Sequence, residues 1–289
     1  MSQTKPTVLA AYNLVGDDIY YHHTRTEPTG EKYYHAPGAH SQYEVHYLIE
    51  GKLSYIIDGV TYRVREGDMI FVAPNEIHML EIDGSSAYER MVILFDMEIL
   101  GRMMKSLGAS LGAFSEEKSN RIHVMNADAV RSFGASEIMR DIVASDSEPE
   151  YKKLEVISKL IRFVIAIDKI VSSGAAALSK PTQADPIVTA VSEYIERNIS
   201  KKIKLDELAS SLFVSPSTLS HRFHRIMGLG VGRYVTMKKM YHAAALISSG
   251  ASASEAAIRV GYDNYNSFFH SFREIIGSSP SALIQRDDR

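Results

Sequence analysis

A segment near the C-terminal end places hydrogen-bonding side chains along one face of an expected helix. Ser215 suits the N-cap of that helix and Pro216 its first position, where a missing N–H costs nothing, while Leu219 and Phe223 mark an apolar face. The opposite face carries hydroxyl, imidazole and guanidinium groups, which can hydrogen-bond to base edges and phosphates. Its members are Ser217, Thr218, Ser220, His221, Arg222 and Arg225. Such a helix, apolar behind and polar in front, is typical of those that read the major groove of DNA.

The same pattern recurs further along the chain. Ala209 and Ala257 are 48 residues apart, and Phe223 and Phe272 are 49 residues apart. Gly261 suits the turn before the second copy of the polar helix, because glycine adopts a positive φ at little cost. The polar face of the second copy consists of Tyr265, Asn266, Ser267, His270 and Arg273. We interpret the two copies as tandem helix-turn-helix units that bind double-stranded DNA.

Other helices must hold these two reading helices in place. Leu205, Leu208 and Leu212 form the apolar stripe of a scaffold helix in the first unit, and the small side chain of Ala209 lets the reading helix approach closely. Ser252 and Glu255 have the spacing of a capping box at the start of the second scaffold helix. The segment 231–248 reads as one helix that connects the units.

Composition and charge agree with a DNA-binding module attached to a second domain. The chain has 289 residues, 45% of them hydrophobic, and no cysteine, which excludes disulfides and thiolate chemistry. Residues 187–289 hold 13 Lys and Arg against 9 Asp and Glu, whereas residues 1–186 hold 19 against 26. No run of about 18 apolar residues occurs, and the N-terminal residues lack the pattern of a secretory signal. We therefore expect a cytoplasmic protein that does not interact with membranes.

The N-terminal half has the pattern of a sheet protein. Short segments between Tyr43 and Phe95 are rich in β-branched and aromatic residues, and Asp58-Gly59 is a strong hairpin signal. An amphipathic helix is expected over 151–173. We predict a two-domain α+β protein, with a β-barrel and following helices over 1–175, a linker over 176–186 and an all-α DNA-binding domain over 187–289.

The C-terminal region resembles the DNA-binding domain of the AraC family of bacterial transcription regulators. The resemblance covers residues 187–283 and rests on LDELASSLFVSPSTLSHRF, AAIRVGYDNYNSFFHSF and the final Gly277 to Ser281. It implies seven helices, with both reading helices in successive major-groove segments about ten base pairs apart. His221 and His270 stand where the family usually has Arg, and Lys204 stands where it often has a Ser or Thr cap. The residues that match the family's base-contacting positions are Ser217, Ser220, His221, Tyr265, Asn266 and His270.

The N-terminal half resembles a cupin, the sensor barrel common in the same regulator family. The matching segments are HSQYE from His40 to Glu44 and, after Gly67-Asp68, PNEIH from Pro74 to His78. Metal cupins hold their ion with three His and one Glu, and the resemblance aligns His40, Glu44 and His78 with three of those positions. Gly38 occupies the fourth ligand position, which is a His in metal cupins. Two interpretations follow: a divalent metal site completed by water, or a pocket for a small organic ligand.

We favour the organic ligand, because one metal ligand is missing. Strand alternation places His46 on the same side as Glu44, which we take as the inner face. The predicted effector-binding residues are thus His40, Glu44, His46 and His78, with Met91, Ile93 and Phe95 expected on a neighbouring strand. This lining suits a polar small molecule such as a sugar or an organic acid.

The sequence therefore predicts a transcription regulator that responds to a small effector and has neither enzyme activity nor a cofactor. Activation through RNA polymerase and a homodimer built by the helices after the barrel are implied by the resemblance alone. Two rivals stay open. One is a metal-cupin enzyme, an isomerase or dioxygenase, fused to a DNA-binding module; the other is a constitutive DNA-binding protein whose barrel only dimerises.

Overall fold

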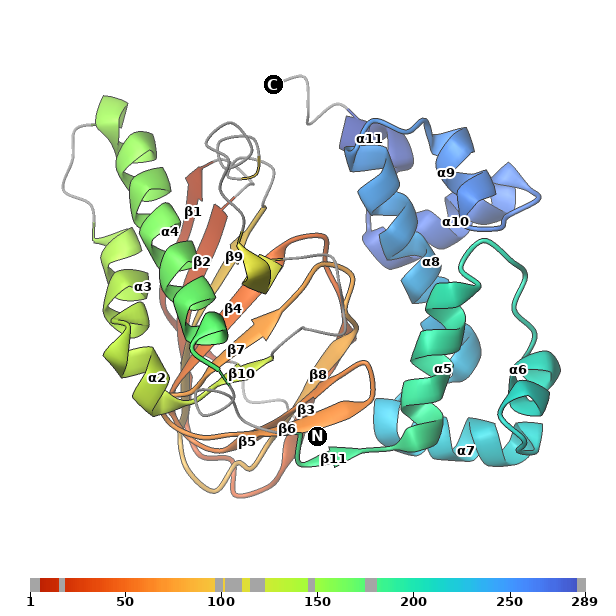
Figure 1. Cartoon of the computed structure of the whole chain (residues 1–289), viewed down its shortest axis with the longest axis horizontal. Helices are drawn as coiled ribbons and strands as arrows, with labels where there is room; N and C mark the ends of the chain where they lie inside the picture. Colours follow the sequence, from red (N-terminus) through yellow and green to blue (C-terminus); the bar gives the residue numbers. More distant parts are fainter. Residues whose placement is uncertain are drawn as a thin grey trace.

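The computed structural model describes residues 6–15, 19–96, 101, 111–114, 123–144, 149–174 and 181–284. Two sheets lie in the middle of the N-terminal part, with helices α2, α3 and α4 on their far side and the C-terminal helices on the opposite side (Figure 1). None of the helices in these ranges is both long and apolar enough to cross a membrane.

The two sheets form the barrel. One sheet has six strands in the order β1-β2-β9-β4-β7-β10, and the other has five in the order β11-β6-β5-β8-β3. The strand bounds are β1 Thr7–Val15, β2 Ile19–Thr26, β3 Tyr33–Gly38, β4 Tyr43–Glu50, β5 Leu53–Ile57, β6 Val60–Val64, β7 Met69–Val72, β8 His78–Ile82, β9 Tyr88–Phe95, β10 Val124–Met125 and β11 Gln183–Ala184. All the strand pairings found are antiparallel.

Alternation along the strands separates two apolar cores. On the six-stranded sheet, Val45, Phe71 and Ile93 face outward and pack against the helices that follow the barrel. Those elements are η1 Gly112–Phe114, α2 Ala127–Ser132, α3 Ala135–Val143 and α4 Pro149–Ser172. Leu48, Ile57, Leu80 and Tyr88 belong to the second core, between the sheets.

The C-terminal part contains seven helices within the described residues, as the resemblance implied. They are α5 Pro186–Arg197, α6 Leu205–Ser211, α7 Pro216–Met227, α8 Val231–Ser248, α9 Ala253–Arg259, α10 Tyr265–Ile276 and α11 Pro280–Ile284. Ala209 and Ala257 are both buried, and each lies in a separate apolar core. The expected connecting helix is α8, whose two ends contribute to both cores.

The expected Asp58-Gly59 hairpin joins β5 and β6 and also contacts the C-terminal part. Both residues have a positive φ, 46° at Asp58 and 86° at Gly59, as a tight two-residue turn requires. A Cβ atom on Gly59 would lie 2.3 Å from Cγ1 of Val188 on α5. Only glycine therefore fits between this turn and the helix.

Barrel and C-terminal helices share an apolar core. Ile56, Ile77 and Met79 of the barrel pack with residues of α5, α7 and α8, including Val188 and Phe223. Of the predicted linker 176–186, the first residues lie outside the described ranges, and Gln183–Ala184 form β11, which pairs with β6.

Candidate nucleic-acid interface and effector site

The first reading helix, α7, begins and packs as its sequence predicts. The Ser215 hydroxyl accepts a hydrogen bond from the Thr218 N–H at 3.1 Å, and Pro216 opens the helix. Leu219 and Phe223 are fully buried. Of the predicted DNA-contacting residues on this helix, Ser217, Thr218, His221 and Arg225 are exposed, while Ser220 and Arg222 are half-buried.

Arg222 differs from its neighbours because it already has a partner. Its Nε donates to Oδ2 of Asp185 at 2.6 Å, while Oδ1 of Asp185 accepts from the N–H groups of Ile187 and Val188 at the start of α5. Arg225 lines a cleft of about 540 Å³ between α7 and the barrel, together with Pro37 and Asp185. In this arrangement, one of the two guanidinium groups on α7 is bound to the chain itself.

The second reading helix, α10, presents its polar face freely. The Asn264 side chain accepts from the Ser267 N–H at 3.0 Å and caps the helix. Phe268 and Phe272 are fully buried. All five residues predicted for its DNA face are exposed: Tyr265, Asn266, Ser267, His270 and Arg273.

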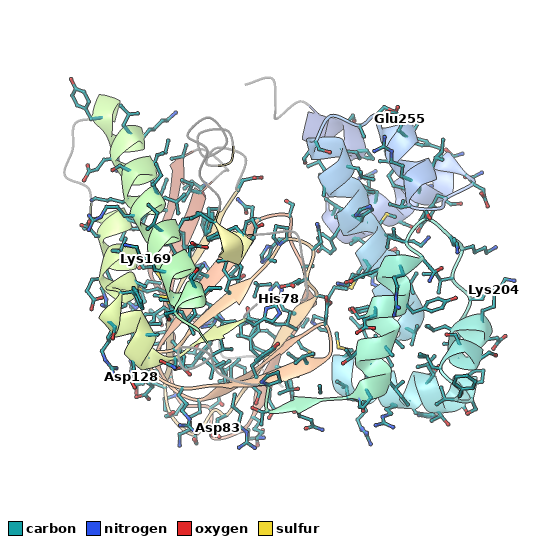
Figure 2. The ribbon with its side chains drawn as sticks, viewed as in Figure 1. His78, Asp83, Asp128, Lys169, Lys204 and Glu255 are labelled. Atoms are coloured by element: carbon teal, nitrogen blue, oxygen red, sulfur yellow. The ribbon has the colours of Figure 1, made fainter. Side chains whose placement is uncertain are left out.

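The scaffold helices begin differently in the two units. α9 has the predicted capping box between Ser252 and Glu255. Lys204 occupies the N-cap position of α6, and its side chain forms no capping hydrogen bond, as the departure from the family pattern suggested. Figure 2 labels Lys204 and Glu255 at the N-terminal ends of these two helices.

A buried lysine joins the two units. Lys239 on α8 donates to the carbonyl oxygen of Lys201 at 2.7 Å and to that of Val260 at 2.6 Å, so it binds the loop before α6 and the end of α9. Gly261 also lies against this loop, since a Cβ atom at position 261 would be 2.4 Å from the carbonyl oxygen of Ser200. The units are therefore held in a fixed arrangement.

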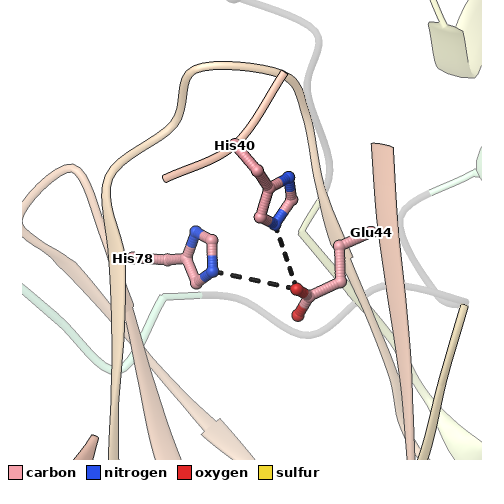
Figure 3. A group of neighbouring side chains, drawn as sticks. All are labelled: His40, Glu44 and His78. Atoms are coloured by element: carbon pink, nitrogen blue, oxygen red, sulfur yellow. Dashed lines mark hydrogen bonds and ion pairs between the residues drawn. The ribbon is translucent and has the colours of Figure 1, made fainter. Parts of the chain in front are cut away.

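In the barrel, the three residues aligned with a metal-cupin site lie together (Figure 3). Nε2 of His40 lies 3.1 Å from Oε2 of Glu44, and Nε2 of His78 lies 3.8 Å from the same oxygen. The hydroxyl of Tyr55 donates to Oε1 of Glu44 at 2.7 Å. Nδ1 of each histidine faces a backbone carbonyl, that of Gln42 for His40 and that of Glu76 for His78.

These contacts decide the charges in the cluster. Burial opposes ionisation, but the hydrogen bond from His40 and the charge of His78 hold the pKa of Glu44 far below its usual value. Burial likewise disfavours the imidazolium form of His40, but Glu44 raises the pKa of His40 above its usual value. Both nitrogens of His40 face acceptors, an arrangement that only the doubly protonated ring satisfies. These contacts favour an ion pair between His40 and the buried Glu44.

The same atoms could also hold a divalent ion. One ligand atom from each of His40, Glu44 and His78 lies within 4.8 Å of the others, and backbone acceptors at Nδ1 orient imidazole ligands in many metal sites. His40 would have to lose its Nε2 proton first. Gly38, paired with His78 across the sheet, offers no fourth side chain. The geometry thus fits either a three-ligand ion or an effector held by hydrogen bonds.

His46 lies on the inner face, as strand alternation predicted, but the expectation for the neighbouring strand was wrong. Glu44 pairs with Leu94 and His46 with Val92, so the inner face of β9 carries Arg90, Val92 and Leu94. Met91, Ile93 and Phe95 instead pack under the helices. The residue types alone did not show which side chains of β9 face inward, because both faces of the strand are largely apolar.

Comparison with known proteins agrees with both halves of the structure. A family model described as an AraC-like ligand-binding domain matches residues 20–131, and one described as a helix-turn-helix domain matches residues 208–286. The uncharacterized HTH-type transcriptional regulator YfiF of Bacillus subtilis is 25% identical over 250 residues, or 83% of this chain and 76% of that protein. The transcriptional activator PerA of Escherichia coli is 26% identical over 223 residues, or 76% of each chain. ToxT from Vibrio cholerae is a solved structure with 14% identity and a TM-score of 0.39, covering 93% of this chain and 97% of that one.

The chain belongs to the AraC family of transcriptional regulators. It is a DNA-binding regulator with an AraC-like ligand-binding domain. The ligand-binding match contains the cluster of His40, Glu44 and His78, and the helix-turn-helix match contains both reading helices. Its relatives are transcriptional regulators rather than enzymes.

Sequence reasoning missed several polar residues of this AraC-family barrel. Arg90 lies on the inner face of β9 and donates to the hydroxyl of Tyr88 at 2.6 Å, and that hydroxyl lies 3.4 Å from Nε2 of His46. His22 pairs across the strands with Val92, the same residue that pairs with His46. Arg90 was a signal, because it is one of two charged residues in β9, but the face on which it lies depends on pairing with β4.

Sequence reasoning also missed the two consecutive lysines of α8. Lys238 and Lys239 are 4% and 5% exposed. Lys238 donates to Oδ2 of Asp58 at 2.6 Å, across the boundary between barrel and helices. Burial disfavours the charge on Lys238, but Asp58 and Glu196 raise its pKa above the usual value. The sequence signal for the burial of both lysines was their position between Met237 and Met240, among the packing residues of the helix.

Proposed function

We propose that this protein regulates transcription in response to a small effector, which binds inside the barrel and alters the affinity of the two reading helices for DNA. The observation that carries this proposal is that two neighbouring strands contact the candidate effector site on one face and the C-terminal helices on the other. Strands β5 and β8 bear polar cluster residues on the inner face and interdomain core residues on the outer face.

The alternation along this wall is strict around the cluster. His78 faces Glu44, while the residues on either side of it, Ile77 and Met79, pack against α5, α7 and α8. Tyr55 donates to Glu44, and the adjacent Ile56 belongs to the interdomain core. In this proposal, an effector that displaces Tyr55 or His78 shifts these strands and thereby changes packing on their other side.

Asp58 extends this route to α8. Its Oδ1 accepts from the N–H of Ile77 at 3.2 Å and from the hydroxyl of Tyr234 at 2.7 Å, and its Oδ2 accepts from Lys238. Because α8 contacts both helix-turn-helix units, a shift of the Asp58-Gly59 turn would move both units together. An effector changes DNA affinity only if it binds one arrangement of barrel and helices more tightly than another.

For DNA binding, we propose that α7 and α10 enter successive segments of the major groove. On α7 the contacts would come from Ser217, Thr218, Ser220, His221 and Arg225, with Arg222 joining them once it leaves Asp185. On α10 they would come from Tyr265, Asn266, Ser267, His270 and Arg273. His221 and His270 would favour sites without guanine at the positions that Arg reads in relatives, since Arg pairs bidentately with guanine and neutral His does not.

We further propose a cytoplasmic homodimer that activates transcription through contact with RNA polymerase. Helix α4 supports a dimer, because Tyr151 and Leu154 are 57% and 66% exposed on it. Light scattering at micromolar concentration tests this part of the proposal, and a monomer mass would contradict it.

The central test is a footprint on DNA upstream of the protein's own operon. We expect two protected major-groove patches on one face of the duplex, with centres about ten base pairs apart. The variants His221→Ala and His270→Ala should each change protection in one patch only. Absence of protection throughout, or loss of both patches in either variant, would contradict the proposed reading mode.

A second experiment distinguishes a regulator from a constitutive DNA-binding protein. Small sugars and carboxylic acids are screened for a rise in melting temperature, which any specific binder must cause by mass action. Each binder is then added to the DNA-binding assay. A binder that leaves operator affinity unchanged would favour the constitutive alternative.

A further inference from the structure

We propose that the effector carries an anionic group, a carboxylate or a phosphate, and that Arg90 inside the barrel binds it. This inference rests on the proposed effector function of the barrel and specifies the chemical class of the effector. It begins from Arg90, a half-buried cation that forms no ion pair with a carboxylate in the part of the chain that the structure describes.

The strand register places Arg90 within the barrel. It pairs with Thr24 on β2 and with Leu48 on β4. Two residues further along β9, Val92 pairs with His22 on β2 and with His46 on β4. Two residues beyond Val92, Leu94 pairs with Glu44 on β4. Diagonal neighbours of this kind are about 7–8 Å apart, within reach of long side chains.

The hydrogen-bonding capacity of Arg90 is mostly unused. Nη1 donates to the Tyr88 hydroxyl at 2.6 Å, and the guanidinium carbon lies 5.2 Å from the centre of the Tyr88 ring. Nε is buried and has no hydrogen-bond partner. Among the described residues, no carboxylate forms an ion pair with Arg90.

Within the described ranges, the carboxylates near Arg90 bind other partners. Glu89, the preceding residue in the chain, faces the opposite side of β9 and pairs with Arg25 and His23. Glu50 also pairs with Arg25. Inside the barrel, Glu44 receives Tyr55 at one oxygen and His40 at the other. Partial burial of a cation without a paired anion costs free energy, and a bound anion would offset that cost.

The imidazoles around Arg90 suit the same ligand. Burial and the charge of Arg90 lower the pKa values of His22 and His35 to about 4. Both rings are therefore neutral at physiological pH and can donate an N–H to an anion. Nδ1 of His22 is buried without a partner.

The barrel interior thus carries polar groups at two levels along the strands. The guanidinium of Arg90 lies at one level, and the carboxyl group of Glu44, opposite Leu94, lies at the other with His40 and His78. A ligand with an anion at one end and hydroxyl or amino groups at the other would satisfy both levels. A neutral sugar would leave the charge of Arg90 uncompensated.

The test uses acetate and inorganic phosphate as minimal probes of the full-length protein. The Nε–H resonance of Arg90 is followed by nitrogen-edited NMR and assigned by its absence in Arg90→Lys, with ethylene glycol as the neutral comparison. We expect a saturable change with an anion and none with ethylene glycol. A response to acetate alone identifies a carboxylate, and a response to phosphate alone identifies a phosphate. No saturable change with either anion, or an equal change with ethylene glycol, would overturn the inference.

Thermal unfolding of variants provides a second, independent measurement. The rise in melting temperature caused by the responding anion should disappear in Arg90→Met and persist in Arg63→Met, which removes an exposed arginine on β6. Arg90→Lys, which keeps the charge but loses the planar fork, should weaken anion binding about tenfold. An undiminished rise in both Arg90 variants would assign the anion to another site.

Operator binding separates this inference from the proposed function. If a neutral molecule alone binds the barrel and changes operator affinity, the regulator proposal stands and the anion inference fails. If an anion binds at Arg90 but the protein protects no DNA, the anion inference stands and the regulator proposal fails.

Discussion

The carboxylate of Asp185 serves two structural elements at once. One oxygen caps α5 through the N–H groups of Ile187 and Val188, and the other holds Arg222 of the first reading helix. Burial favours the neutral acid, but Arg222 and the backbone donors keep the pKa of Asp185 below its usual value. The carboxylate is therefore ionised at neutral pH, and an Arg222 that is bound to it cannot contact a phosphate.

This pairing predicts the effect of Asp185→Asn. Asparagine keeps the oxygen that caps α5 but loses the charge, so Arg222 should become available to DNA. We expect tighter binding to DNA of any sequence and a salt dependence of log Kd that steepens by about one. Fluorescence anisotropy with random-sequence DNA at several salt concentrations measures both. Asp128→Asn, which removes an exposed carboxylate on α2, should change neither; equal effects in both variants would contradict the prediction.

A second residue-scale prediction concerns the ion pair of His40 and Glu44. Because the folded pKa of His40 is raised, the stability it contributes is present below about pH 6.5, its usual pKa, and is lost as the pH rises through the folded value. Glu44→Gln removes the negative charge, so the pKa of His40 should fall below that of the wild type. Histidine NMR titration in the presence of a chelator measures the change. Glu81→Gln, which removes a carboxylate paired with Lys32, should leave it unaltered, and an unchanged His40 in Glu44→Gln would refute the pairing.

At the scale of elements, local signals predicted local structure well. The caps at Ser215 and Ser252 and the Asp58-Gly59 turn depend on residues within a few positions of one another. The face of β9 depends on its partner strand, far away in the chain, and there the prediction for Met91, Ile93 and Phe95 failed. Burial of the α8 lysines depends on several elements meeting around one helix, which periodicity within that helix does not reveal.

Substitution of Lys239 tests how the two helix-turn-helix units are joined. Burial lowers the pKa of Lys239, and its ammonium group satisfies the carbonyl oxygens of Lys201 and Val260. Lys239→Met leaves both carbonyls without this donor, so we expect a loss of about 1–3 kcal/mol in the free energy of unfolding. Urea denaturation measures that loss. The footprint should also become weaker in one patch, because the readers no longer bind as one body.

Lys202→Met is the matched control, because Lys202 is exposed in the same loop region. It should change the free energy of unfolding by no more than a few tenths of a kcal/mol. A Lys239→Met protein as stable as this control, with both patches intact, would mean that packing alone fixes the arrangement of the units.

At the scale of the whole molecule, the barrel and the DNA-binding helices meet through both packing and charge. The sequence predicted two parts and a linker, but it contained no local signal for the contact between them. The apolar residues Ile56, Ile77 and Met79 look like ordinary barrel residues until the helices are placed on them. On the opposite face of the same strands, Tyr55 and His78 line the cluster that is proposed to sense the effector, so domain contact and sensing share β5 and β8.

The buried pair of Asp58 and Lys238 tests whether this contact is a coupling element. Asparagine tolerates the positive φ of position 58, so Asp58→Asn keeps the turn and removes the charge that Lys238 faces. Removing one partner of a buried pair typically costs about 3–5 kcal/mol; Glu196 and the Asn75 carbonyl also contact Lys238, so we expect about 2 kcal/mol here. The loss should fall on the contact between the parts. Calorimetry should then resolve separate unfolding of barrel and helices, and small-angle scattering should report a larger radius of gyration.

The double variant Asp58→Asn with Lys238→Met distinguishes coupling from general damage. It removes the unpaired buried ammonium, so it should recover part of the stability lost in Asp58→Asn, a non-additivity expected of residues in contact. If the pair also transmits effector binding, the double variant should still bind its effector and operator but no longer change operator affinity when the effector is added. Additive losses in stability, together with an intact effector response, would assign transmission to the apolar wall of Ile56, Ile77 and Met79 instead.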